Sequence, residues 1–130
     1  MSYEFNVTLN TDFDTAMEQV RAALQAEHLG IVSEVDVQAV LKAKMDKTIA
    51  PYRIWGACSP KLADEILTEE PNAGTLLPCN LVLYQKAEGE VVVSFMDPVT
   101  VLGLAQSDTA QTVARDAKLK LQAVVERLAV

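Results

Sequence analysis

An apolar stripe near the C-terminal end of the chain restricts the fold more than any other feature of the sequence. Apolar residues recur there at helical spacing through several turns, after a capping residue at Ser107 or Asp108. They are Ala110, Val113, Ala117, Leu121, Val124 and Leu128. This spacing predicts a long helix with one apolar face, and such a face needs a second layer to pack against.

Segments that could form the second layer alternate between apolar and polar residues, as strands with one buried face do. The clearest is residues 3–10, whose odd-numbered positions are all apolar or aromatic. Further strands are predicted over residues 31–36, 52–58, 80–85 and 91–96. A polar loop that contains Gly89 joins the last two, which predicts a hairpin and therefore a sheet that is at least partly antiparallel.

Helices are predicted between the strands. A long helix begins after Thr11 or Asp12 and ends before Gly30, with apolar residues at helical spacing. Residues 37–45 form a short amphipathic helix. A third helix has Ser59 as its N-cap and Pro60 at its first position, and residues 71–74 end it. Residues 75–78 are predicted to be a loop, and a short helical turn follows the pair Asp97-Pro98.

The order of these elements predicts the fold class. Strands and helices alternate up to the hairpin, and the first and last helices are long and apolar on one face only. We therefore predict an α+β two-layer sandwich, in which about five strands form a mixed or antiparallel sheet with the two long helices on one face. Residues 1–130 are expected to form a single domain, since no linker, repeat or low-complexity tract interrupts them.

The composition limits the kinds of partner that we expect and indicates the cellular compartment. The net charge of −7, with scattered Lys and Arg, argues against nucleic acid and anionic membranes as partners. The sequence has no export signal and no apolar stretch long enough to span a bilayer. Its two cysteines are therefore expected to be free thiols in the cytoplasm.

The first candidate site residue is Cys58, which ends a predicted strand just before the helix that starts at Pro60. The partial positive charge of a helix N-terminus lowers the pKa of a nearby thiol, so Cys58 could be a reactive or metal-binding thiolate. A buried cysteine that packs as a small apolar side chain is the alternative. Both interpretations remain open at the level of the sequence.

The second cysteine, Cys79, precedes a predicted strand and is followed by Asn80. Asn80 could hydrogen-bond a ligand or close the loop as an Asx turn. The distance in sequence between Cys58 and Cys79 fits neither a zinc ribbon nor a Cys-x-x-Cys redox motif. They would form one site only if the fold brought their segments to the same edge of the sheet. A metal bound at that site could have Cys58 and Cys79 as ligands.

Other polar residues have a functional and a structural interpretation. Arg53 could bind an anion or form a salt bridge, and strand alternation places it with Trp55 on the face opposite Cys58. Gly56 could mark a bulge or a close backbone approach. Glu34 and Asp36 share one face of a predicted strand. They could act as a pair of carboxylates, or they could simply belong to a solvated surface.

The lone His28 lies near the predicted end of a helix, and a surface cap is favoured over a metal ligand there. In residues 31–36, alternation places Val32 with Glu34 on one face and Ile31 with Ser33 on the other. The sequence contains no phosphate-binding loop, no dinucleotide-binding glycine cluster and no hydrolase motif, and it specifies no cofactor.

Two segments resemble a known family. They are PYRIWGACSPKLA at residues 51–63 and LLPCN at residues 76–80, with Tyr84 and the pair Asp97-Pro98. Over nearly the whole chain the sequence resembles the bacterial family known as domain of unknown function 302 (DUF302). The resemblance implies a topology like that of the TATA-binding protein, often assembled as a dimer, and no established activity. A DNA-binding role does not follow from the fold, since the chain is acidic.

The family pattern adds positions to the candidate site, which then comprises Arg53, Cys58, Cys79, Asn80 and Asp97. The leading hypothesis is a homodimeric binding module that holds a small molecule or a soft metal ion near the cysteines. A second is an enzyme of thiol redox or transfer chemistry with Cys58 as the nucleophile. A third is a structural or regulatory protein-interaction domain with inert cysteines.

Overall fold

The computed structural model describes residues 2–129, so the outermost residues of the predicted domain, 1 and 130, lie outside the described part of the chain. The elements alternate as the sequence predicts, with one additional 3-10 helix. In chain order they are β1 (Glu4–Leu9), α1 (Phe13–Ala26), β2 (Gly30–Asp36), α2 (Val37–Met45), β3 (Tyr52–Cys58), α3 (Pro60–Glu69), η1 (Pro71–Leu76), β4 (Cys79–Gln85), β5 (Val91–Met96), α4 (Pro98–Leu102) and α5 (Asp108–Leu128).

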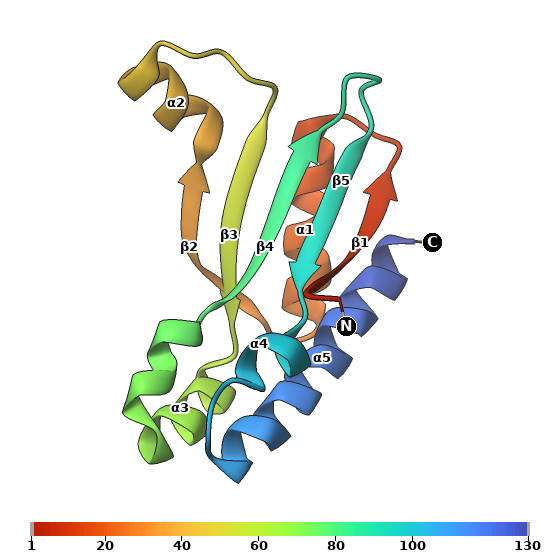
Figure 1. The fold of residues 1–130 in the computed structure, drawn as a ribbon. Helices are drawn as coiled ribbons and strands as arrows, with labels where there is room; N and C mark the ends of the chain where they lie inside the picture. The colour runs from red at the N-terminus through yellow and green to blue at the C-terminus, as the bar shows by residue number, and fades with distance from the viewer. Residues whose placement is uncertain (1, 130) are drawn as a thin grey trace.

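The strands form one open five-stranded sheet in the order β1-β5-β4-β3-β2. Every neighbouring pair is antiparallel, so the sheet is antiparallel throughout and not mixed. The predicted hairpin of β4 and β5 is confirmed. Strand β1 returns to pair with β5, while β2 pairs with β3 at the other edge of the sheet (Figure 1).

The two long helices pack on the same face of the sheet, which confirms the predicted α+β two-layer architecture. In Figure 1 strands β4 and β5 pass in front of α1, while α5 runs beside it on the same side. The predicted stripe of α5 is buried except for Leu128, which packs against the core while partly exposed. Phe95, Leu81 and Trp55 are the large sheet residues that meet these helices in the core.

A second, smaller core lies beyond one end of the sheet. It contains Ile66 of α3, Ala73 of η1, Leu102 of α4 and Ala110 of α5, all buried. The helix η1 occupies residues that were predicted to end α3 and begin a loop. Pro71 starts this helical turn, and burial of Ala73 stabilises it, so that part of the sequence prediction was wrong.

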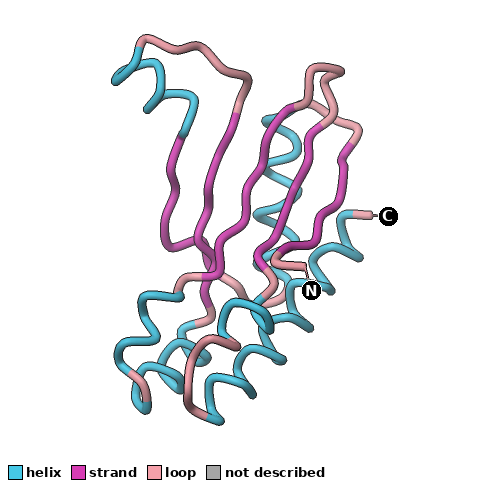
Figure 2. Tube along the Cα trace, in the orientation of Figure 1, coloured by secondary structure: helices cyan, strands magenta, loops and turns pink. Residues whose placement is uncertain are grey.

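Helix α2 extends away from the rest of the domain. Figure 2 shows α2 and the loop after it beyond the ends of the central strands. None of the residues of α2 is buried, and its contacts are with β2 and β3. We call β2 and α2 together the β2–α2 arm.

A bulge in β2 changes the predicted facing of its side chains. The pairing with β3 shifts between Ile31 and Ser33, so Val32 is the extra residue. Ile31 therefore packs against the helix-covered core, on the same face as Glu34, and the uninterrupted alternation predicted for residues 31–36 was wrong.

The end of α1 also differs from the sequence prediction. His28, with φ of 60°, adopts the left-handed conformation after α1, and Gly30 already belongs to β2. The expected exposed position of His28 is confirmed.

Gly56 lies where two segments approach β3 closely. A Cβ atom at Gly56 would come within 2.3 Å of Ser33 Oγ and 2.4 Å of Pro78 Cγ. The serine hydroxyl can rotate, but the proline ring is fixed to the backbone of the next strand. The close approach expected at Gly56 is made by the side chains of Ser33 and Pro78 and not by another backbone, while the bulge lies in β2.

Substitution of Gly56 by Ala tests this close packing. We expect Gly56→Ala to lower the free energy of unfolding by about 1–3 kcal/mol, because the added methyl group forces β3 and Pro78 apart. Gly30→Ala, a matched strand substitution whose Cβ would be 3.9 Å from its nearest neighbour, should change it by less than about 0.5 kcal/mol. Urea unfolding followed by circular dichroism measures the free energy of unfolding of both variants. Equal effects of the two substitutions would contradict the close packing at Gly56.

Candidate functional site

The structure brings Cys58 and Cys79 together, although they lie in separate segments of the sequence. Strands β3 and β4 are neighbours, and their register sets Ala57 opposite Cys79. Cys58 is the next residue, at the end of β3, where the chain turns into α3. Both cysteines are free, partly buried, and line one cavity between the end of the sheet and the helices.

The cavity is small and almost entirely apolar. Its volume is about 20 Å³. The walls come from α3, α4, α5 and the adjoining loops, and apart from the cysteines and Ser59 they are Leu29, Ala57, Leu62, Ala63, Leu77, Leu102, Val113, Ala117 and Leu121. A single atom or a water molecule fits this space, whereas pockets for small organic ligands have volumes of roughly 300–1,000 Å³.

Burial raises the pKa of the Cys58 thiol above its ordinary value. This direction is opposite to the expectation that the N-terminus of α3 would lower it. The Cys58 Sγ points to the backbone oxygen of Ser59, to which it donates a hydrogen bond of 3.5 Å, and the Ser59 side chain makes no cap hydrogen bond. Loss of solvation around Cys58 disfavours its thiolate and so raises the pKa of the thiol.

The thiol of Cys79 is perturbed further in the same direction. Burial in the core, and then the proximity of Cys58, raise the pKa of Cys79 to about 12. The contribution of Cys58 has a simple cause, since two thiolates this close repel each other. Both thiols are therefore protonated at neutral pH, and the cavity favours one negative charge over two.

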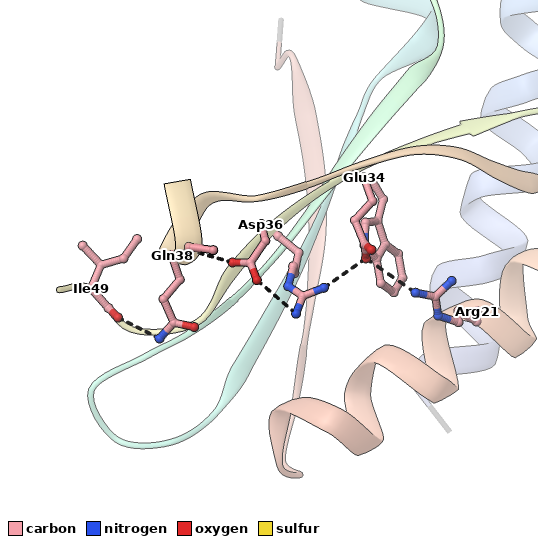
Figure 3. A network of polar contacts seen from close by, with 8 residues as sticks. Arg21, Glu34, Asp36, Gln38 and Ile49 are labelled. Atoms are coloured by element: carbon pink, nitrogen blue, oxygen red, sulfur yellow. Dashed lines mark hydrogen bonds and ion pairs between the residues drawn. The ribbon is translucent and has the colours of Figure 1, made fainter. Parts of the chain in front are cut away.

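Arg53 does not line the cavity and forms salt bridges instead, as the structural interpretation of this residue predicted. Its guanidinium lies 3.2 Å from Glu34 Oε2 and 3.3 Å from Asp36 Oδ2 (Figure 3). The bulge in β2 places both carboxylates on the same face as Arg53, where they stay partly exposed to solvent, and their salt bridges to Arg53 mean that they are not a free acid–base pair.

Glu34 also connects this edge of the sheet to α1. Its Oε2 accepts a hydrogen bond from the indole N–H of Trp55 and lies 3.5 Å from Arg21 Nη2. The Arg21 guanidinium stacks 4.5 Å from the centre of the Trp55 ring. The sequence analysis missed Arg21, although its position on the sheet-facing side of a predicted helix was a usable signal.

Asn80 and Asp97 lie outside the cysteine cavity as well. Asn80 follows Cys79 on β4 and so points to the opposite face of the sheet, where it is exposed. Asp97 is 8% exposed and accepts hydrogen bonds from Val99 N and Lys118 Nζ, each at 2.9 Å. These contacts join α4 to α5, which gives Asp97 a structural role in the described chain.

The cysteine pair is not part of a larger metal site. Within residues 2–129, no group of three or more His, Cys, Asp or Glu side chains is arranged to hold a metal ion. Any metal bound at the cavity would therefore have the two sulfur atoms as its protein side-chain ligands.

A search of the same residues for a helix long and apolar enough to cross a membrane finds none.

Comparison with known proteins identifies a family to which no activity is assigned. The family model described as "Domain of unknown function DUF302" matches residues 5–128. The crystal structure of an uncharacterized conserved DUF302 protein from Bacillus stearothermophilus is similar, with a TM-score of 0.88 and 25% sequence identity over 98% of this chain and 99% of that chain. No curated protein matches the chain.

The pH dependence of alkylation tests the environment of Cys79. In a Cys58→Ala variant the contribution of Cys58 is lost, but burial, the larger cause, still raises the pKa of Cys79 above 9.0 and leaves less thiolate at neutral pH. We expect the rate of iodoacetamide alkylation, followed by mass spectrometry, to keep rising about tenfold per pH unit above pH ~9. The denatured variant is the control, and a plateau near pH ~9 in the folded protein would refute the assignment.

Proposed function

The chain belongs to the DUF302 family, and we propose that in this member Cys58 and Cys79 bind one soft monovalent metal ion, of which Cu(I) is the representative. The observation that carries the proposal is the convergence of two free thiols on one apolar cavity. Thiolate sulfur is a ligand type that favours Cu(I), together with Zn²⁺ and iron–sulfur clusters, over hard metal ions. The domain would then act as a small metal-binding module in the cytoplasm, where thiols stay reduced.

The size of the cavity favours an ion over an organic ligand. About 20 Å³ accommodates one atom and excludes even a small metabolite unless α3 moves away from the sheet. Two sulfur ligands satisfy Cu(I), which accepts linear coordination, whereas Zn²⁺ in proteins takes four ligands. The apolar walls also exclude water, which protects a monovalent copper thiolate from exchange and oxidation.

The charge balance of binding is favourable at this position. Two thiols and one Cu(I) ion give a bis-thiolate complex of net charge −1 and release two protons. A metal cation between the sulfur atoms would cancel the repulsion between the two thiolates, which is the smaller of the two causes that raise the pKa of Cys79 to about 12, after burial. The remaining negative charge lies close to the N-terminus of α3, where the helix dipole stabilises it.

The alternative of a thiol enzyme has weaker support. A nucleophilic cysteine requires a lowered pKa or an adjacent base, and burial moves the pKa of Cys58 upward. Each side chain that lines the cavity is either apolar, a cysteine or Ser59, so the cavity contains no base. The raised pKa values are equally compatible with inert core cysteines, and metal binding separates that interpretation from the proposal.

Competition with a chromogenic Cu(I) chelator, under anaerobic conditions, tests the proposal. We expect one Cu(I) per chain, with an affinity that rises about a hundredfold per pH unit between pH ~6 and 8, since two protons are released. Cys58→Ser and Cys79→Ser should each remove the site. A pH slope of about tenfold would indicate a single thiolate and contradict the two-cysteine site.

Two controls make this measurement specific. Met45→Leu removes an exposed soft sulfur outside the cavity and should leave the Cu(I) affinity unchanged. Zn²⁺ should bind at least about a hundredfold more weakly than Cu(I), because the site has too few ligands for it. If the double variant Cys58→Ser/Cys79→Ser binds Cu(I) as tightly as the natural sequence, the cysteines are inert.

We further propose that the domain is a homodimer, formed through the β2–α2 arm. The outer edge of β2 has no neighbouring strand within residues 2–129, and such an edge is a template for pairing with a second copy. The arm also carries exposed apolar side chains, namely Val32, Val35, Val40 and Met45. Their exposure, from 41% to 67%, supports a surface that a second chain covers.

Sedimentation equilibrium tests the homodimer. We expect a dimer for the natural sequence, and a monomer for the variant Val40→Lys/Met45→Lys, because two buried ammonium groups would oppose association. Leu119→Lys alters an equally exposed leucine on α5 and should leave the dimer intact. A natural sequence that sediments as a monomer at all concentrations would refute this part of the proposal.

A further inference from the structure

The face of the sheet opposite α1 and α5 carries a groove that the two cysteines do not reach. In Figure 1 this face of β4 and β5 is turned toward the viewer, and no helix covers it. The groove has a volume of about 390 Å³, which lies in the range for small-molecule sites. It runs over β4 and β5 between side chains of β1 and β3.

The shape of the groove follows from the strand register. Val82 and Ser94 are paired across β4 and β5, and their short side chains form the floor. Next to them on the same face, Tyr52 and Tyr84 are paired across β3 and β4, with their rings stacked 5.6 Å apart. The tyrosine pair therefore forms a rigid wall at one end of a hollow with short side chains at its base.

The charge in the groove comes from Glu4. Its carboxylate Oε2 accepts hydrogen bonds from Ser94 Oγ at 2.6 Å and Asn6 Nδ2 at 3.0 Å. These bonds lower the pKa of Glu4, that from Ser94 more than that from Asn6. Oε1 has its closest donor at 3.5 Å, also Asn6, so this oxygen is available to a ligand.

The chemistry of the walls selects the charge of a ligand. Among the described residues, no Lys or Arg side chain lines the groove, and the chain has a net charge of −7, so the electrostatic potential disfavours an anion there. The Glu4 carboxylate attracts a cation through its charge, and the stacked tyrosine rings of the same groove offer a surface to an aromatic body. Val82 and Met96 suit an apolar body of the same molecule.

We propose that this groove binds a small organic cation with an aromatic or apolar body, whose ammonium group pairs with Glu4 while its body lies against Tyr84 and Val82. This site is independent of the cysteine cavity. The alternating side chains of β4 place Cys79 on the helix-covered face and Val82 and Tyr84 on the open face. Substitutions in the groove therefore leave the Cu(I) affinity unchanged.

The test uses three probes of nearly equal shape and different charge. Titration of the ¹⁵N-labelled chain with 2-phenylethylamine, 2-phenylethanol and 3-phenylpropionate is followed through the amide signals of β4 and β5. We expect the amine to bind about fivefold more tightly than the alcohol, because only the amine forms an ion pair with Glu4, and the carboxylate to bind most weakly. The amide signals of α5 should not respond.

Variants assign the contacts. Glu4→Gln keeps hydrogen-bonding capacity toward Ser94 and Asn6 and should weaken amine binding about fivefold without affecting the alcohol. Glu18→Gln, on α1 behind the sheet, should change neither. Val82→Trp fills the groove and should abolish binding of every probe. The proposal is overturned if none of the probes shifts the signals of β4 and β5, if amine and alcohol bind equally, or if binding persists in Val82→Trp.

Discussion

The antiparallel pairing of β3 with β4 is the constraint on which the rest of the structure depends. It joins the hairpin and β1 on one side to the β2–α2 arm on the other, and without it the sheet would divide into two parts that could not cover α1 and α5 together. Gly56 permits this pairing, because any larger residue would meet Pro78. The same register sets Ala57 opposite Cys79 and so determines that the two thiols share a cavity.

Most of the fold could be predicted because the local signals agree with one another. The alternation in residues 3–10, the apolar stripe of α5 and the polar hairpin loop each correspond to a single type of element, and packing did not override them. The prediction failed where the deciding interaction is distant in sequence. The helical turn at Pro71–Leu76 depends on burial of Ala73 against α4 and α5, and the bulge at Val32 depends on the pairing of β2 with β3. Neither interaction has a periodic signature.

The sequence was enough to identify the residues of the candidate site, but not to predict their proximity or the pKa values of the thiols. The two cysteine segments were identified from the sequence, but whether they meet depends on strand order, which no local pattern encodes. The expected activation of Cys58 considered the helix and neglected burial among the apolar side chains of α3 and α5, which raises the pKa of the thiol. For Arg53 the salt-bridge interpretation was correct. In the pairing of β2 with β3, Asp36 lies directly opposite Arg53 and Glu34 lies diagonally from it, and both form salt bridges with its guanidinium. Asp97 has its partner, Lys118, far along the chain.

Strand alternation also explains how so small a domain can hold two unlike environments. Successive residues of β4 face opposite sides of the sheet, so Cys79 enters an apolar cavity closed by helices while Asn80 faces solvent beside the open groove. The covered side raises thiol pKa values and excludes water, which suits a soft metal ion. The open side keeps Glu4 solvated and ionised in the same groove as a stacked pair of tyrosine rings, which suits an organic cation. A shift of β4 by one residue would exchange these environments, and the close contact of Gly56 with Pro78 opposes that shift.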